Sequence, residues 1–178
     1  IEAVTKEASK YPNIKVVTLK TKYPQGAEKQ LINVCTGREV PSGGLPADAG
    51  AVVDNVATAA QIAKSLRTGL PLIERICTVT GGAIANPKNV MFKIGTLYSD
   101  IINMTGGFKE EPKKIISGGP MMGVALASVD VPANKGTSGI LCFTEKEAHI
   151  DDMQNCIRCA KCVGVCPAFL EPVYISAY

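Results

Sequence analysis

Apolar residues recur at helical spacing in two stretches of the first third of the chain, residues 27–35 and 56–66. Each stretch places its apolar residues on one helical face, and a glycine follows it as a stop signal. Asp54 or Asn55 is a good N-cap for the second helix, because either side chain accepts a hydrogen bond from a first-turn amide. These signals predict two helices, separated by a Gly- and Pro-rich loop at residues 40–46.

Two further elements are expected before these helices. Residues 2–10 read as the end of a helix that stops at Tyr11–Pro12, since proline disfavours a helical residue before it. Residues 14–19 are rich in β-branched side chains and predict a strand. Residues 1–73 are therefore expected to form the back half of an α/β unit.

From residue 74 the pattern changes to short apolar runs separated by turns. The runs predict strands, and Ile101 and Ile102 fall on the buried side of a short helix. Strands and a helix within so short a span suggest a small β-grasp-like module, which gives an α+β fold overall. The expected elements are strands at 76–80, 90–94 and 114–116, with the helix at 97–103.

The composition restricts the classes of function. Hydrophobic residues make up 46% of the chain, enough for one good core or two small ones. The net charge is only +3 and the lysines are scattered, which argues against a nucleic-acid or membrane-surface partner. No apolar run approaches the ~18 residues that span a bilayer. The sequence therefore indicates a protein that does not itself cross a membrane.

Four of the seven cysteines lie between residues 156 and 166, in the order C-x₂-C-x₂-C-x₃-C-P. This spacing lets the sulfurs of one tight loop wrap a cubane, so it predicts [4Fe–4S] ligation. Cys156, Cys159 and Cys162 are expected to hold one cluster, and Cys166 a second. A structural zinc site is the alternative, but zinc favours two separated C-x₂-C pairs.

The second cluster would need cysteines beyond Tyr178, so we expect the natural protein to continue past this residue. Ile1 is not Met, so continuation is expected before it as well.

The remaining cysteines, the histidine and one glycine-rich segment are not assigned a role in binding or catalysis. Cys35, Cys77 and Cys142 are expected to be ordinary buried thiols. His149 is expected to be an exposed loop residue, and Ser117–Gly123 lacks the nucleotide-binding glycine patterns and reads as a turn. No catalytic residue is assigned.

With these residues in view, the chain resembles the C subunits of Rnf electron-transport complexes (RnfC). Members of that family share a flavin- and NADH-binding domain with the 51-kDa subunit of respiratory complex I. A soluble-ligand-binding β-grasp (SLBB) domain and a two-cluster ferredoxin-like module follow it. The resemblance rests on Lys22–Leu31, Arg38–Pro41, Ser117–Gly123, Lys135–Gly139 and the cysteine run.

The resemblance implies a division of the chain into four parts. Residues 1–73 would be the C-terminal part of the flavin domain, and residues 74–130 the β-grasp domain. Residues 131–150 would be a linker, and residues 151–178 the first half of the ferredoxin-like module. The family's glycine-rich nucleotide loop is absent from this chain, so we expect weak FMN binding and no NADH dehydrogenase activity from it alone.

The resemblance also implies cofactor-binding residues. Gly26 and Glu28 would meet the flavin (FMN) and NADH, while Asp54, Asn55 and Thr58 would contact the flavin phosphate and ring. A helix start there offers free amides to a phosphate. Asp54 stands where the family has Asn, and its carboxylate would repel a phosphate. A simple N-cap role for Asp54 and Asn55 is the alternative.

The function implied is electron transfer between NADH or flavin and iron–sulfur carriers in a membrane-associated, ion-translocating complex. The partners would be the other Rnf subunits, which alone would hold the chain at the cytoplasmic face of the bacterial inner membrane. No nucleic-acid partner is expected. Two alternatives remain: a segment of a flavin/iron–sulfur cobalamin reductase, and a zinc-stabilised binding module without redox function.

Overall fold

The structure is a computed structural model that describes residues 1–166 and 168–178. The chain forms two compact units. The sheet unit is Asn55–Gln154, and the helical unit combines Ile1–Asp54 with Asn155–Tyr178. Each unit is described by itself.

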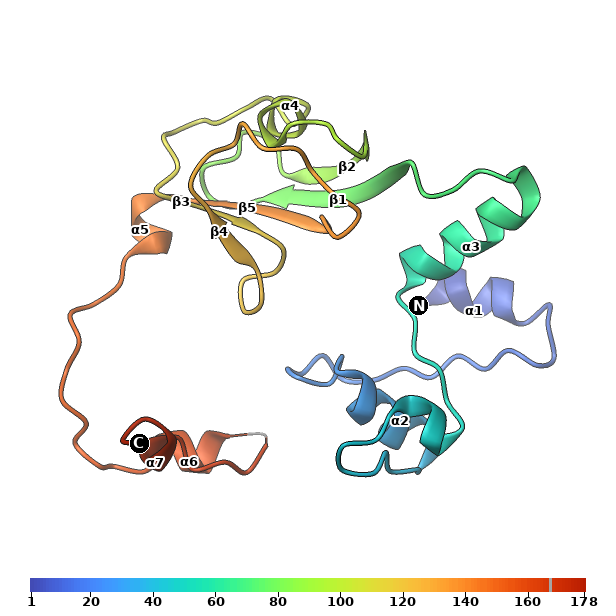
Figure 1. Cartoon of the computed structure of the whole chain (residues 1–178), viewed down its shortest axis with the longest axis horizontal. Helices are drawn as coiled ribbons and strands as arrows, with labels where there is room; N and C mark the ends of the chain where they lie inside the picture. Colours follow the sequence, from blue (N-terminus) through green and yellow to red (C-terminus); the bar gives the residue numbers. More distant parts are fainter. Residues whose placement is uncertain (167) are drawn as a thin grey trace. The chain divides into compact units, whose positions relative to one another are not determined.

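A five-stranded mixed sheet forms the centre of the sheet unit, with the strand order β2-β1-β5-β3-β4 (Figure 1). Among the described strands, β1 and β5 pair in parallel and the other neighbours pair antiparallel. The last strand in sequence is therefore inserted between two hairpins. The strands are β1 (Glu74–Thr80), β2 (Lys88–Lys93), β3 (Lys114–Ser117), β4 (Val124–Leu126) and β5 (Gly139–Phe143).

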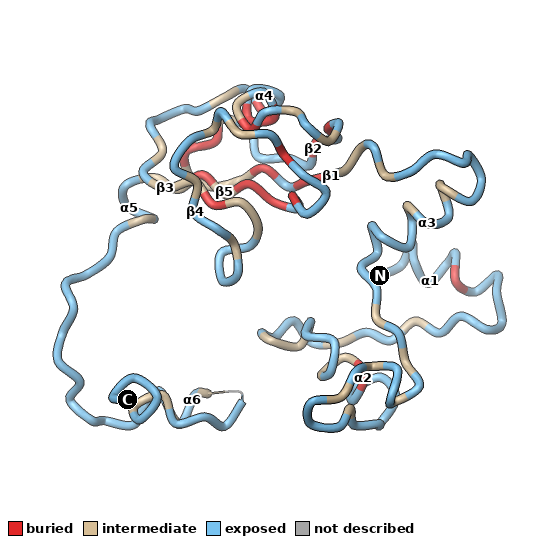
Figure 2. Tube along the Cα trace, viewed as in Figure 1, coloured by how far each residue is buried: buried red, intermediate tan, exposed pale blue. Residues whose placement is uncertain are grey.

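The core lies on one face of this sheet, because alternate residues of each strand point to the same side. Cys77 pairs with Val90 in register, and Ile140 of β5 lies opposite Val79. Helix α4 (Tyr98–Asn103) adds three buried side chains to the same cluster. Figure 2 shows the buried residues gathered in this unit. The core consists of Cys77, Val79, Ala83, Ile84, Val90, Phe92, Tyr98, Ile101, Ile102, Ala133, Ile140 and Cys142.

A pair of glycines after β1 allows the end of the sheet to close against α5 (Glu145–Ala148). Gly81 has φ +116°, and a side chain there would strike the Cys142 backbone. One carboxylate oxygen of Glu147 accepts hydrogen bonds from the Gly82 N–H at 2.9 Å and the Thr144 N–H at 3.0 Å. The bonds from Thr144 and Gly82 hold the pKa of Glu147 below its ordinary value. Glu147 therefore ties α5 to the turn after β1.

Short helices and irregular segments make up the helical unit. It contains α1 (Glu2–Ala8), α2 (Glu28–Thr36), the 3₁₀ turn η1 (Pro46–Ala49), α6 (Lys161–Val165) and α7 (Pro172–Ile175). Among its described residues the buried ones are Ala8 and Ile32. None of the helices in the described part of the chain is long and apolar enough to cross a membrane.

The expected helices are present with small shifts of their ends. Helix α3 (Val56–Thr68) begins after Asn55, whose side chain accepts a hydrogen bond from the Ala57 N–H at 2.9 Å. Asn55 rather than Asp54 is therefore the N-cap. Gly37 and Gly69 end α2 and α3 in the left-handed conformation, as expected.

Three expectations about the fold are wrong. Residues 14–19 form no strand, and Ile14 and Val17 are exposed, because β-branched residues favour a strand only where a neighbouring strand pairs with them. Residues 139–143, expected in a linker, form the central strand β5. Cys35 is exposed on α2 rather than buried, whereas Cys77 and Cys142 are buried as expected.

Candidate functional site

The four clustered cysteines lie on one loop and the short helix that follows it. Cys156 and Cys159 belong to the irregular segment before α6, Cys162 lies within α6, and Cys166 is its C-cap residue. All four are free thiols; the first three are exposed and Cys166 is half-buried. The chain therefore presents these sulfurs at its surface, open to a metal centre.

The backbone around these cysteines is wound so that amides point at sulfurs. Arg158 and Ala160 have φ of +54° and +55°, in the left-handed region that non-glycine residues rarely adopt. The Arg158 N–H donates to the Cys156 sulfur at 3.4 Å, and the Leu170 N–H donates to the Cys166 sulfur at 3.4 Å. Such amide donors stabilise negative charge on a thiolate.

Within residues 1–166 and 168–178, no group of three His, Cys, Asp or Glu side chains lies close enough together to hold a metal ion. The donor set nevertheless suits iron–sulfur ligation, because thiolates are its protein ligands and amide donors to sulfur accompany it. The cysteine loop therefore fits an iron–sulfur centre by its donor chemistry and its sulfur-directed amides.

The remaining thiols and the histidine lie outside this loop. Burial raises the pKa of both Cys77 and Cys142 to about 11, so these thiols are protonated and unreactive at neutral pH. His149 is exposed, with its Nε2 3.2 Å from a carboxylate oxygen of Asp151. None of these residues belongs to a group that could hold a metal ion in the described part of the chain.

The five residues expected at the flavin divide between the two units. Gly26 and Glu28 belong to the helical unit, where Gly26 lies in an open turn directly before α2. Asn55 and Thr58 lie at the start of α3 in the sheet unit, and Asp54 immediately precedes them. Both groups are thus at helix starts, where free amides face outward.

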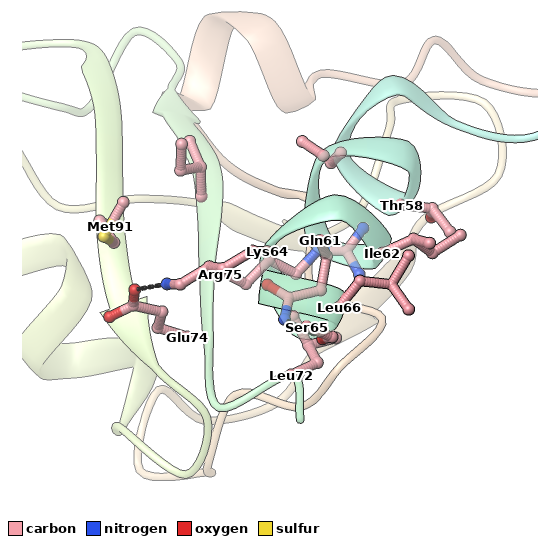
Figure 3. A pocket seen from close by; sticks show the side chains of 13 residues that line it. Thr58, Gln61, Ile62, Lys64, Ser65, Leu66, Leu72, Glu74, Arg75 and Met91 are labelled. Carbon is pink, nitrogen blue, oxygen red and sulfur yellow. Dashed lines mark hydrogen bonds and ion pairs between the residues drawn. The ribbon is translucent and has the colours of Figure 1, made fainter. Parts of the chain in front are cut away.

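A groove of about 580 Å³ lies between α3 and the edge of the sheet formed by β1 and β2 (Figure 3). An ion pair between Lys64 and Glu74 crosses from the helix to the strand and lowers the pKa of Glu74. No residue of α3 is buried, and apolar side chains of this helix line one wall of the groove. The other main lining residues are Ala57, Ala60, Ile62, Leu66, Leu72, Ile76 and Met91.

Sequence reasoning did not identify this groove. Ile76 and Met91 were available as a signal, because they are apolar residues on the alternate, outward face of their strands. Of the expected flavin residues only Thr58 lines the groove, and the four clustered cysteines do not.

Two family models match the chain. The model described as the Nuo51 FMN-binding domain matches residues 1–64, and that of the SLBB domain matches residues 76–125. The SLBB match begins within β1, ends within β4 and stops before β5. The FMN-binding match ends within α3.

Curated proteins match along nearly the whole chain. The chain is 57% identical over its full length to the C subunit of the Na(+)-translocating ferredoxin:NAD(+) oxidoreductase complex of Acetobacterium woodii, of which it covers 40%. It is 55% identical to the proton-translocating counterpart of Clostridium ljungdahlii, over 99% of the chain and 38% of that protein. The C subunit of the ion-translocating oxidoreductase complex of Rhodobacter capsulatus is 44% identical over 99% of the chain and 34% of its own length. These similarities confirm the resemblance seen in the sequence.

Proposed function

Since this chain is homologous along its whole length to the C subunits of ion-translocating oxidoreductase complexes, we propose that it carries electrons between a flavin and iron–sulfur clusters in such a complex. The observation that carries the proposal is the cysteine loop, in which two backbone amides donate to ligand sulfurs. The match of residues 1–64 to an FMN-binding domain supports the flavin end of the route.

The cluster ligands are the four clustered cysteines. Cys156, Cys159 and Cys162 hold one [4Fe–4S] cluster, and Cys166 contributes to a second. When bound, such a cluster accepts and releases single electrons. The chain's own part is to place four thiolates and to stabilise their charge, since the Arg158 and Leu170 amides already point at Cys156 and Cys166.

The proposed flavin residues lie around the starts of two helices. Gly26 precedes α2 and Glu28 is its first residue, while Asp54 and Asn55 precede α3 and Thr58 lies in its first turn. The Asn55 side-chain oxygen is occupied by the Ala57 N–H, so it caps the helix and leaves its amide nitrogen for a ligand. The first-turn amides of α3 and the Thr58 hydroxyl are the groups that suit an FMN phosphate. The Asp54 carboxylate repels that phosphate and is better suited to a hydroxyl donor.

The proposed domains follow the expected divisions, with one change. Residues 1–73 are part of an FMN- and NADH-binding domain, and residues 151–178 begin a ferredoxin-like module. The SLBB domain extends from residue 74 to α5, because β5 lies at the centre of its sheet. The partners are the other subunits of the complex, which alone hold the chain at the cytoplasmic face of the cell membrane.

Anaerobic reconstitution with iron and sulfide tests the cluster. We expect broad absorption near ~400 nm from thiolate-to-iron charge transfer and an EPR signal after reduction. Cys159→Ser should remove most of this absorption. Cys35→Ser, which changes an exposed thiol on α2, should leave it unchanged. Stoichiometric zinc binding without any iron–sulfur absorption would instead assign the loop to a zinc-stabilised module.

Titration of the full-length protein with FMN tests the flavin residues. Thr58→Val keeps the side-chain shape but loses the hydroxyl, and we expect it to weaken FMN binding about 5–10-fold, the value of one hydrogen bond. Thr68→Val, at the opposite end of the same helix, is the matched control. Equal affinity for both variants would remove Thr58 from the site.

A further inference from the structure

Left-handed backbone at residues other than glycine is confined, in the described part of the chain, to the segment that carries the clustered cysteines. Arg158, Ala160 and Phe169 have φ of +54°, +55° and +55°. This conformation costs free energy for any residue with a Cβ atom, so it persists only where the surrounding structure requires it. The strain of this chain is therefore placed beside its proposed cluster ligands.

Helix α6 accounts for one of these three residues. Ala160 is its N-cap, and the Ala160 carbonyl accepts hydrogen bonds from the Val163 and Gly164 N–H groups at 3.0 and 3.2 Å. Arg158 and Phe169 lie outside the described helices, and both side chains are exposed, that of Phe169 to 94%. Packing of these two side chains therefore does not explain their backbone conformation.

Both residues instead stand at an amide that donates to a cysteine sulfur. Because φ is the rotation about the N–Cα bond, the φ of Arg158 fixes its own N–H relative to the chain that follows, and this N–H faces the Cys156 sulfur at 3.4 Å. The φ of Phe169 orients the next peptide group, whose Leu170 N–H faces the Cys166 sulfur at 3.4 Å. Each left-handed residue thus serves one sulfur.

We propose that Arg158 and Phe169 are positioning residues that set the reduction potentials of two clusters separately. The inference rests on the proposed function, in which Cys156 belongs to one cluster and Cys166 to a second. An amide that donates to a ligand sulfur stabilises the more negative, reduced state and so raises the potential of that cluster. Two independent left-handed residues let the chain order the two potentials along the route of the electrons.

The charge of Arg158 is a competing explanation at the first cluster, because a positive charge in the cluster loop also favours the reduced state. It does not extend to the second cluster, since Phe169 is uncharged. The test therefore keeps the charge constant and changes only the backbone preference. Asn and Val suit this purpose: both are neutral and similar in size, but Asn tolerates the left-handed region and a β-branched residue does not.

The experiment is a redox titration of the full-length protein, reconstituted anaerobically with iron and sulfide and followed by EPR. Phe169→Val should lower the potential of one cluster relative to Phe169→Asn by about 59 mV, which is a ~10-fold change in a one-electron equilibrium and the value of one hydrogen bond. Arg158→Val should lower the potential of the other cluster relative to Arg158→Asn. In each pair the second potential should stay unchanged.

A measurement on the unstrained question of contact decides the case if a valine variant assembles no cluster. In wild-type protein with ¹⁵N-labelled leucine, pulsed EPR of the reduced state should detect the Leu170 amide nitrogen coupled to a cluster, and Leu170→Met should remove that coupling.

Three results would overturn the proposal. These are equal potentials in the Asn and Val variants, a shift of both clusters or of the same cluster by the two valine variants, and no coupling from the Leu170 nitrogen. Wild-type protein that shows no iron–sulfur absorption after reconstitution would refute the proposed function itself. The two failures are thus distinguishable.

Discussion

Replacing Ile140 by alanine probes the insertion of β5 at the centre of the sheet. Ile140 lies opposite Val79 on one side and Ser117 on the other, and its side chain is 0% exposed. Shortening a fully buried isoleucine removes apolar contacts and leaves a cavity, at a cost of ~2–5 kcal/mol. For a unit of this size such a loss lowers the unfolding temperature by at least ~8 °C.

The neighbouring residue supplies a matched control. Leu141 follows Ile140 on β5 but points to the opposite face of the sheet and is half-buried. Leu141→Ala should therefore cost roughly half of the ~1.5–3 kcal/mol that a fully buried leucine contributes. Urea unfolding followed by far-ultraviolet circular dichroism gives both free energies. Hydrogen exchange should show β1 and β3 losing protection in Ile140→Ala.

The relative losses of stability in Ile140→Ala and Leu141→Ala test the position of β5 in the sheet. If Leu141→Ala destabilised the chain as much as Ile140→Ala or more, the register of β5 between β1 and β3 would be wrong. Unchanged protection of β1 in Ile140→Ala would also contradict the central position of β5.

Three further results are expected. A chain cut after residue 130 should lack the cooperative thermal transition of the intact chain, because it loses β5; a sharp transition in it would contradict the topology. Glu147→Gln should destabilise the chain at pH 7, and the difference should fade as pH falls below the ordinary value of 4.5 and through the lowered pKa of Glu147; a difference that persists at pH 2 would exclude a role for the charge. At pH 8 a thiol reagent should modify Cys35 rapidly and spare Cys77 and Cys142, whose pKa is about 11; mass spectrometry of the peptides reads this directly.

The sequence predicts helices better than strands, for local reasons. Helices α2 and α3 carry their own start and stop signals, such as the Asn55 cap and the glycines that end them. A strand needs a partner that can be distant in sequence. Residues 14–19 have strand propensity but no partner, whereas Gly139–Phe143 is a continuous apolar run that pairs on both sides. A short continuous apolar run of this kind is typical of a central strand, and that signal was available in the sequence.

The features of the candidate site also differ in how far the sequence alone can predict them. The spacing of the cysteine run is sufficient to propose a ligand set from sequence alone, because the donors lie within one short segment, and that set stays a prediction. The left-handed backbone at Arg158 and Ala160 could not be predicted, since neither residue favours it. The flavin residues come from two distant segments, so local patterns cannot determine how they combine.

The position of β5 also sets the order of events while the chain is being made. The β1–β2 and β3–β4 hairpins emerge first, but the slot between β1 and β3 stays open until β5 follows. From the end of β3 at residue 117 to the end of β5 at residue 143 is 143 − 117 = 26 residues, about 1–5 s of synthesis at ~5–20 residues per second. During that interval two apolar strand edges have no partner. We expect chaperone contact with nascent chains to peak between these lengths and to fall once β5 has emerged.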